Sequence, residues 1–115
     1  MDSRILEILQ YTLKPGSGVE FHRIMQEISI PLHAREGMDV VAYGQSLHDP
    51  DAYYLMRAFD SQEALAGAEA RFYSSDGWLS GPRMAIIERI ENSLKSVISM
   101  PTAAIDALRT QSVNS

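Results

Sequence analysis

A chain of 115 residues lies within the usual size range of one domain, and 45% hydrophobic with 22% charged residues is typical of a globular protein. Fifteen acidic against ten basic residues leave a net charge of -5, with no Lys/Arg cluster that could neutralise a run of phosphates, which argues against nucleic acid as a partner. The absence of cysteine excludes a disulfide framework and a thiolate nucleophile, so any metal must be bound by His and carboxylate groups.

The first residues lack the long apolar region of a secretory signal, because Glu7 interrupts the one candidate segment. No stretch approaches the roughly 20 apolar residues of a membrane span. We therefore expect a cytoplasmic protein without a membrane span. A domain of this size buries only a modest fraction of its unfolded surface, so pairing with a second copy would enlarge its core.

The first predicted element is a strand over residues 4–13, which is rich in strand-forming residues and ends at a Pro- and Gly-rich turn. Ser17 and Glu20 then have the spacing of a capping box at the start of a helix. Apolar residues recur at helical spacing after them, at Phe21, Ile24, Met25, Ile28 and Leu32. These observations predict a first helix.

Two prolines, Pro31 and Pro50, affect the structure expected between the first helix and the third strand. Pro31 has no N–H and would clash with the preceding turn, so the first helix is expected to kink or restart near Ile30 before it ends at Gly37. Residues 38–48 and 52–59 are strand-like and flank an Asp-Pro-Asp turn. This arrangement predicts a β-hairpin.

Two further helices and a strand follow. Asp60 and Glu63 form another possible capping box, which predicts a helix over residues 61–73. A proline at a helix start, Pro82, precedes apolar residues that indicate a third helix. Residues 94–100 have the length and branched side chains of a last strand.

The predicted order is β-α-β-β-α-α-β. It matches an α+β, ferredoxin-like sandwich, in which an antiparallel sheet packs its helices on one face. We assign residues 1–100 to this domain and residues 101–115 to a short C-terminal extension that begins with one helical turn and then frays. The sheet face without helices would let two copies meet and enclose a shared lumen.

Several short segments, in their order and spacing over residues 4–100, resemble the pattern of the NIPSNAP family. They are Glu7-Ile8, Tyr11-Thr12-Leu13-Lys14-Pro15-Gly16, Gly37-Met38, Arg57-Ala58-Phe59-Asp60-Ser61, Phe72-Tyr73-Ser74-Ser75, Trp78 and Gly81-Pro82-Arg83. The resemblance implies a homodimeric α/β barrel of the kind shared with antibiotic-biosynthesis-type and haem-degrading monooxygenases. It implies no particular reaction.

Strand alternation places Glu7 and Tyr11 on one face of the first strand and Arg57 on a mixed face of the third strand. We expect these three residues to line the lumen, with Glu7 and Arg57 paired and Tyr11 available to a ligand. The alternative is an ordinary cross-strand ion pair that fixes the dimer geometry or meets solvent.

Trp78, the single tryptophan, and Arg83 lie in a Gly-flanked connector that could form a lid near the mouth of the lumen. The alternative is that Trp78 anchors the connector to the core. The three histidines lack the spacing of a metal site, so no metal is expected. By analogy with haem enzymes of this barrel type His33 would be a haem ligand; otherwise it only favours a helix end, and no cofactor is expected.

The sequence therefore leaves three functions open. The first is a NIPSNAP-like protein that binds a small apolar or aromatic molecule in the barrel of a homodimer. The second is a cofactor-independent monooxygenase related to the antibiotic-biosynthesis enzymes. The third is a non-catalytic dimeric interaction module. The ligand candidates are Glu7, Tyr11, Arg57, Trp78 and Arg83, and whether the protein is an enzyme is undecided.

Overall fold

Four antiparallel strands form one sheet in the computed structural model, which describes residues 2–113, with side chains described as far as Arg109. The strands are β1 (Ser3–Leu13), β2 (Asp39–Gln45), β3 (Ala52–Phe59) and β4 (Ile90–Pro101), and their order in the sheet is β2-β3-β1-β4. The central pair, β1 and β3, is in a register that places Glu7 opposite Arg57. The predicted α+β class with an antiparallel sheet is confirmed.

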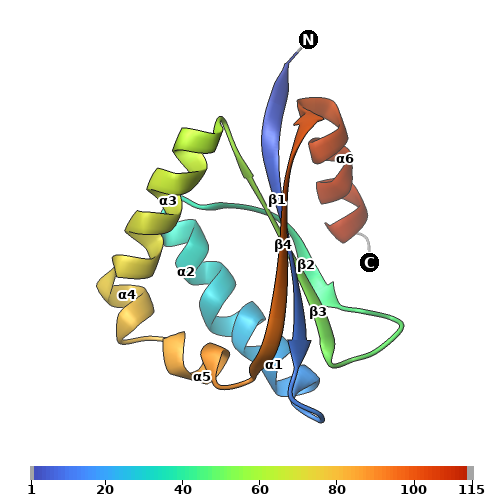
Figure 1. The fold of residues 1–115 in the computed structure, drawn as a ribbon, viewed down its shortest axis with the longest axis vertical. Helices are drawn as coiled ribbons and strands as arrows, with labels where there is room; N and C mark the ends of the chain where they lie inside the picture. Colours follow the sequence, from blue (N-terminus) through green and yellow to red (C-terminus); the bar gives the residue numbers. More distant parts are fainter. Residues whose placement is uncertain (1, 114–115) are drawn as a thin grey trace.

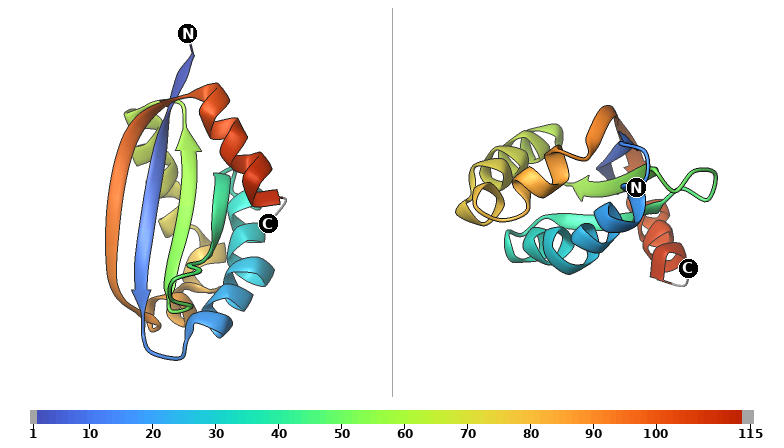
Figure 2. Two further views of the ribbon diagram at one scale, coloured as in Figure 1. Left: turned by 90° about the vertical axis from the view of Figure 1, so that its right-hand side faces the viewer. Right: turned by 90° about the horizontal axis from the view of Figure 1, so that it is seen from below.

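Most of the helical chain covers one face of the sheet (Figure 1). These elements are α1 (Gly18–Ile24), the π-helical segment η1 (Met25–Ser29), α2 (Ile30–Arg35), α3 (Gln62–Ser74), α4 (Asp76–Leu79) and α5 (Arg83–Ile87). The last helix, α6 (Thr102–Val113), runs along the opposite face and leaves part of that face open (Figure 2).

Each face of the sheet has its own apolar cluster. The larger cluster fills the space between the sheet and α1 to α5, and includes Leu9, Leu13, Phe21, Leu55, Phe59, Phe72 and Trp78. The smaller one lies under α6, where the fully buried Ile105 packs with Leu6, Val41, Ala42 and Ala58. The helix after the last strand is thus packed on the sheet and is longer than the single turn predicted. The fraying predicted after that turn is wrong as far as Val113, and residues 114–115 lie outside the described residues.

The start of α1 is capped differently from the prediction. The Ser17 hydroxyl donates to the Lys14 carbonyl at 2.6 Å and does not cap the helix. The Asp51 carboxylate, from the β2–β3 loop, accepts instead from the N–H groups of Gly16 at 2.9 Å and Gly18 at 2.8 Å. The predicted capping box is wrong because a carboxylate distant in sequence supplies the cap. A Cβ at Gly18 would clash with the Pro50 carbonyl in this approach.

The first helix continues through Pro31. The chain winds as a π-helix just before it, where the Ile30 N–H donates to the Met25 carbonyl five residues earlier. Proline has no N–H and its ring crowds the carbonyl one turn back, so a wider turn accommodates it. The change predicted near Ile30 is confirmed as a wider turn, without a break in the helix.

The later elements follow the prediction with small shifts. The cap of α3 is Ser61, whose hydroxyl accepts from the Ala64 N–H at 3.0 Å, while Asp60 pairs with Arg4 at 3.2 Å. The connector around Trp78 forms the short helix α4. Among the described residues no helix is long and apolar enough to cross a membrane.

Candidate functional site

The predicted lumen wall lies on the other face of the sheet from the one expected. Glu7 and Arg57 are 0% and 1% exposed and lie on the face that the helices cover. That face also carries large apolar side chains such as Leu9, Leu55 and Phe59, which the helices bury. Alternation identified which residues share a face but not which face receives the helices. The placement of Glu7 and Arg57 on the open sheet face, in a dimer lumen, is therefore wrong, whereas Tyr11 lines a hollow on each side of the sheet.

Arg57 is the centre of a buried polar cluster. Its Nε donates to Oε1 of Glu7 at 2.6 Å, which confirms the predicted pair. Its Nη1 donates to the Tyr73 hydroxyl at 2.9 Å and lies 3.1 Å from Nε2 of His33. Its Nη2 donates to Oε1 of Glu69 over a longer distance, 3.4 Å. The planar guanidinium thus connects β1, β3, α2 and α3 through one side chain.

Lys95 on β4 adds a second cation to the cluster. Its Nζ lies 3.2 Å from each carboxylate oxygen of Glu69 and 3.1 Å from Oε2 of Glu7. The contact with Glu7 is close but is not aligned as a hydrogen bond, so Oε2 is a buried acceptor with no hydrogen-bond donor among the described residues. Lys95 itself is 44% exposed, and it forms the solvent side of the cluster.

The carboxyl groups of Glu7 and Glu69 differ in how readily each becomes protonated. Burial alone would raise the pKa of Glu7, but its polar contacts with Glu69 and Arg57 outweigh burial and lower that pKa. Burial and then the neighbouring Glu7 raise the pKa of Glu69. Glu7 is therefore the firmly ionised partner of Arg57, and Glu69 is the more easily protonated group.

His33 is a neutral member of the cluster. Burial, and then the charge of Arg57, lower its pKa to about 4. Its Nδ1 lies 2.7 Å from the Ser29 carbonyl, so the neutral ring donates there and Nε2 accepts from Arg57. With both ring nitrogens engaged and 2% of the residue exposed, His33 does not fit as a haem ligand in this arrangement. The described residues contain no group of three or more His, Cys, Asp or Glu placed to hold a metal ion.

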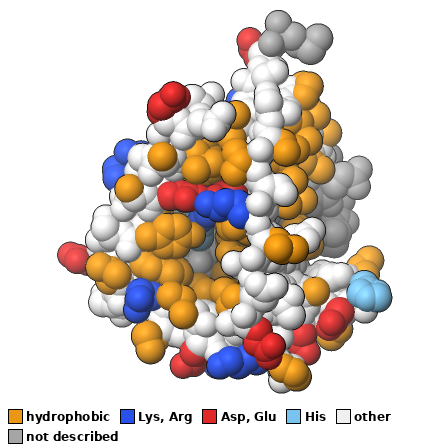
Figure 3. Space-filling model, viewed as in Figure 1, with side chains coloured by type: hydrophobic (Ala, Val, Ile, Leu, Met, Phe, Trp, Pro, Cys, Tyr) orange, Lys and Arg blue, Asp and Glu red, His pale blue; other side chains and the backbone are white. Residues whose placement is uncertain are grey.

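A small cavity adjoins this cluster between the sheet and the helices. It measures about 20 Å³ and is lined by Tyr11, Phe21, Met25, Ser29, His33, Leu55, Tyr73, Trp78 and Ile86. Trp78 is 7% exposed, and its ring lies 5.1 Å from the Tyr73 ring and 5.6 Å from the Phe72 ring, centroid to centroid. In Figure 3 the surface is hollowed between β4 and the helices α3 and α4, next to a pair of acidic and basic side chains.

The structure brings together most of the predicted ligand candidates. Tyr11 and Trp78 line the cavity, while Arg57, paired with Glu7, contacts two of its lining residues, His33 and Tyr73. Burial raises the pKa of Tyr11, and its hydroxyl has no hydrogen-bond partner among the described residues. Arg83 is exposed on α5, with its nearest polar contact at the Met84 sulfur, and does not reach the cavity.

Sequence reasoning missed four members of the site. Glu69 and Tyr73 are four residues apart, so helical spacing places them on one side of α3, and that spacing was a usable signal. Lys95 follows from alternation along β4, where it pairs with Leu9 on the helix-covered face. Ser29 had no signal, because its position depends on the π-helical turn before Pro31.

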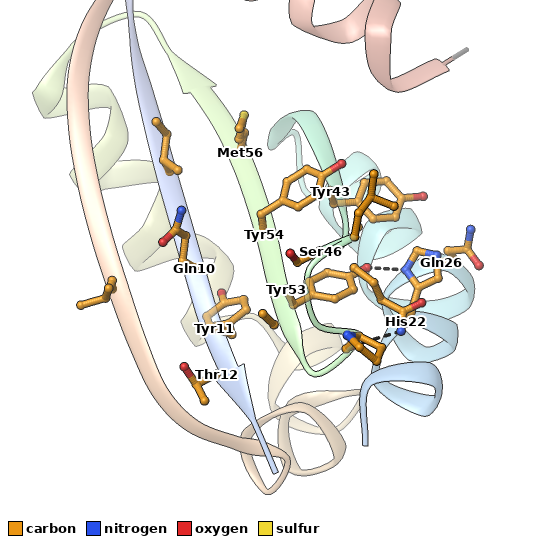
Figure 4. A pocket seen from close by; sticks show the side chains of 17 residues that line it. Gln10, Tyr11, Thr12, His22, Gln26, Tyr43, Ser46, Tyr53, Tyr54 and Met56 are labelled. Atoms are coloured by element: carbon orange, nitrogen blue, oxygen red, sulfur yellow. Dashed lines mark hydrogen bonds between the residues drawn. The ribbon is translucent and has the colours of Figure 1, made fainter. Parts of the chain in front are cut away.

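A second, larger hollow extends over the open face of the sheet and around the β2–β3 loop to the side of α1. This groove of about 1190 Å³ is lined by Ile8, Gln10, Tyr11, Thr12, His22, Gln26, Tyr43, Gly44, Gln45, Ser46, Leu47, Pro50, Ala52, Tyr53, Tyr54, Met56 and Leu94. Figure 4 shows several of these side chains around the β2–β3 loop, with His22 joined to Tyr53. His22 Nδ1 lies 2.6 Å from the Tyr53 hydroxyl, and burial lowers the pKa of His22. The described lining contains no Asp, Glu, Lys or Arg.

Solved structures share this fold. A NIPSNAP family protein from Agrobacterium tumefaciens matches with a TM-score of 0.79 at 18% identity, over 89% of this chain and 89% of that chain. A second NIPSNAP family protein of unknown function from the same organism matches with a TM-score of 0.77 at 23% identity, over 85% and 88%. The putative antibiotic biosynthesis monooxygenase from Nitrosomonas europaea gives 0.60 at 14% identity, over 84% and 95%.

No protein family model and no curated protein matches the chain. The resemblance to NIPSNAP proteins is therefore confirmed at the level of the fold. At sequence identities of 14% to 23%, similarity to these structures shows a shared fold and does not show a shared activity.

Proposed function

We propose that the chain binds a small apolar or aromatic molecule in the cavity between its sheet and its helices, and that it does so as a cytoplasmic homodimer. The observation that supports the ligand site is an aromatic-lined cavity next to a buried polar cluster. Ligand sites commonly combine apolar walls with a few placed polar groups. Buried ion pairs also serve structure alone, so a ligand site is indicated by the cavity more than by the pair.

The cavity holds only a water-sized group as it stands, at about 20 Å³. A larger molecule requires a side chain at the hollow to move. Tyr73 is the lining residue that suits this role, since it is 37% exposed and lies at the end of α3. Rotation of its side chain would widen the cavity toward solvent and bring a ligand against Trp78.

Trp78 allows a direct test, because it is the single tryptophan and it lines the cavity. The protein is titrated with haem, quinones, polyphenols and fatty acids, with Trp78 fluorescence and thermal stability as readouts. A ligand of the folded state raises the melting temperature as its concentration increases. We expect saturable quenching with stabilisation for at least one of these classes.

A cavity-filling variant tests the location. Ser29→Val adds volume to the wall of the cavity, so binding should be lost while overpacking costs about 1–3 kcal/mol. Ser99→Val, an exposed position on β4, is the control and should bind as the parent chain does. Equal binding by both variants would show that the ligand lies elsewhere.

Support for the homodimer comes from the open sheet face. Its exposed apolar residues include Leu94 at 64% and Ile98 at 38%, and its groove has no charged lining residue. A two-fold interface places a surface against its own copy, so this groove would meet its own copy without like-charge repulsion. We therefore assign this face to a second copy of the chain.

A monooxygenase activity is the second candidate function. It is favoured by the fold shared with the putative antibiotic biosynthesis monooxygenase and by the aromatic walls of the cavity. The test is oxygen uptake with any aromatic ligand that quenches Trp78. Uptake that depends on an open cavity, and is lost in Ser29→Val, would support the enzyme. Binding without uptake would leave the chain a binding protein, and absence of both would favour a non-catalytic interaction module.

A further inference from the structure

The charged groups at the hollow differ in how tightly they are held. Glu7 is 0% exposed and receives the 2.6 Å bond from Arg57. The side chain of Glu69 is 19% exposed and receives only longer contacts, 3.4 Å from Arg57 and 3.2 Å from Lys95. Both cations reach the same oxygen, Oε1. Glu69 therefore places a carboxylate between two cations without a short bond to either.

The charge balance of the cluster depends on Glu69. With Glu69 ionised, the two carboxylates of Glu7 and Glu69 balance the cations of Arg57 and Lys95. Burial and the nearby Glu7 disfavour that ionised form, and raise the pKa of Glu69. When Glu69 is neutral or turned toward solvent, two cations face one carboxylate, so the cluster carries one excess positive charge and accommodates one further anion.

The space beside this position is apolar and aromatic. Tyr73 lies one helical turn beyond Glu69 on α3, accepts from Nη1 of Arg57, and has its ring centroid 5.7 Å from the guanidinium carbon. The rings of Tyr73 and Trp78 then lead to the cavity wall. One small molecule could therefore place an anionic group at Arg57 and Lys95 and an apolar body against the rings of Tyr73 and Trp78.

We infer that the ligand of this site is a small carboxylic acid with an apolar or aromatic body, whose carboxylate takes the place of the Glu69 side chain between Arg57 and Lys95. The inference rests on the proposed function and names the class of its ligand. Glu69 is then an internal competitor that occupies the anion position in the empty protein. Buried charge-assisted contacts of this kind favour an anion over a neutral molecule of the same shape.

The experiment compares benzoate with benzyl alcohol, which has a similar size and no charge, by Trp78 fluorescence and by NMR shift titration at pH 7. Glu69→Gln removes the competing charge, so benzoate should bind roughly tenfold more tightly, the change expected for one charge-assisted contact. Lys95→Met should weaken benzoate by roughly threefold, since the exposed Lys95 is partly screened by solvent. Benzyl alcohol should respond to neither substitution.

Glu63→Gln is the matched control. It removes a carboxylate from the same helix at an exposed position with no ion pair among the described residues, so it should leave benzoate binding unchanged. All three substitutions are at positions outside the apolar core, and circular dichroism checks that each variant is folded. Arg57 is left intact because its removal would isolate the buried Glu7.

The outcomes separate the two proposals. Quenching of Trp78 by both probes without preference for benzoate, and without a gain in Glu69→Gln, overturns the carboxylic acid inference and keeps the proposed cavity. No response to either probe in any variant overturns the inference alone, since the cavity is tested separately by haem, quinones, polyphenols and fatty acids. Tighter binding of benzoate in Glu63→Gln as well as in Glu69→Gln would also overturn it, because a general loss of negative charge would then be the cause.

Discussion

Arg57 makes polar contacts with four side chains while it is 1% exposed, and Glu7 is its partner at the shortest distance. Removal of one member of such a buried pair leaves a charge without compensation, whereas removal of both leaves none. Loss of one partner should therefore lower the stability mainly because it leaves the other charge buried and unpaired, and less because the attraction between the two is lost.

Arg57→Met should lower the free energy of unfolding by about 3–5 kcal/mol. The double variant Arg57→Met with Glu7→Leu should recover a large part of this loss, because no isolated carboxylate remains. Urea unfolding of both variants measures the difference. Arg23→Met breaks the exposed pair with Glu20 and should leave the free energy of unfolding nearly unchanged, because solvent screens that pair. A double variant as unstable as Arg57→Met would contradict this account.

The lowered pKa of His33 makes the free energy of unfolding depend on pH. Its pKa is about 4 in the folded protein against an ordinary value of 6.5, so the unfolded chain binds the proton more readily. Stability that depends on neutral His33 is present above pH 6.5 and is lost as the pH falls toward 4. The lowered pKa of Glu7 acts in the same direction, and the raised pKa of Glu69 acts in the opposite one.

A comparison with His33→Gln isolates the contribution of the histidine, since both glutamates remain in the variant. Between pH 7 and pH 5 the parent chain should lose roughly 2 kcal/mol more than His33→Gln does. Urea unfolding at the two pH values measures this. Parallel losses in the two proteins would show that His33 does not titrate as described.

At the scale of elements, α6 closes a part of the sheet that α1 to α5 do not reach (Figure 2). Ile105 is 0% exposed there, and Arg109 holds the helix to β2 through bonds of 2.7 and 2.8 Å to Asp39. The helix is therefore fixed by an apolar contact and by a bidentate ion pair.

Ile105→Ala should lower the free energy of unfolding by about 3 kcal/mol, because it leaves a cavity under α6. Val19→Ala, at a position on α1 that is 73% exposed, should change it by less than about 0.5 kcal/mol. Thermal or urea unfolding provides the measurement. A loss at Ile105 no greater than that at Val19 would mean that α6 contributes little to the stability of the chain.

At the scale of the whole molecule, the helical segments from α1 to α5 cover one face of the sheet, and α6 only partly covers the other face (Figure 1). The edge strand β4 is exposed along most of its length. An exposed edge strand that carries apolar side chains such as Leu94, next to a groove without Asp, Glu, Lys or Arg in its described lining, is a surface that proteins usually cover by association.

Leu94→Asp should shift the proposed dimer toward a monomer at micromolar concentration, because it places a charge in the interface of both copies. Analytical ultracentrifugation measures the mass. Met84→Asp changes a residue of similar exposure, 62% against 64%, on the opposite side of the sheet, and should leave the dimer intact. A parent chain that is already monomeric would overturn the assignment of this face.

The elements follow from local rules. Turn residues bound each strand, apolar spacing marks the helices, and alternation placed Glu7 and Arg57 each among mostly apolar neighbours of its own strand. The paired register of β1 and β3 then joins them. The caps were less predictable: Asp51 caps α1 from a loop 33 residues away, and a short-range capping box gave no indication of it.

The sequence by itself determined the order of the four strands, the antiparallel class and the Glu7–Arg57 pair, because propensity, periodicity and alternation act between neighbouring residues. The short helix α4 and the full length of α6 were not predicted. Only the tertiary structure decided which sheet face the helices cover, and thus that the pair meets His33, Glu69 and Tyr73. Both faces carry apolar residues, so local pattern does not distinguish them. The choice depends on how much apolar area each face buries once the whole chain is packed.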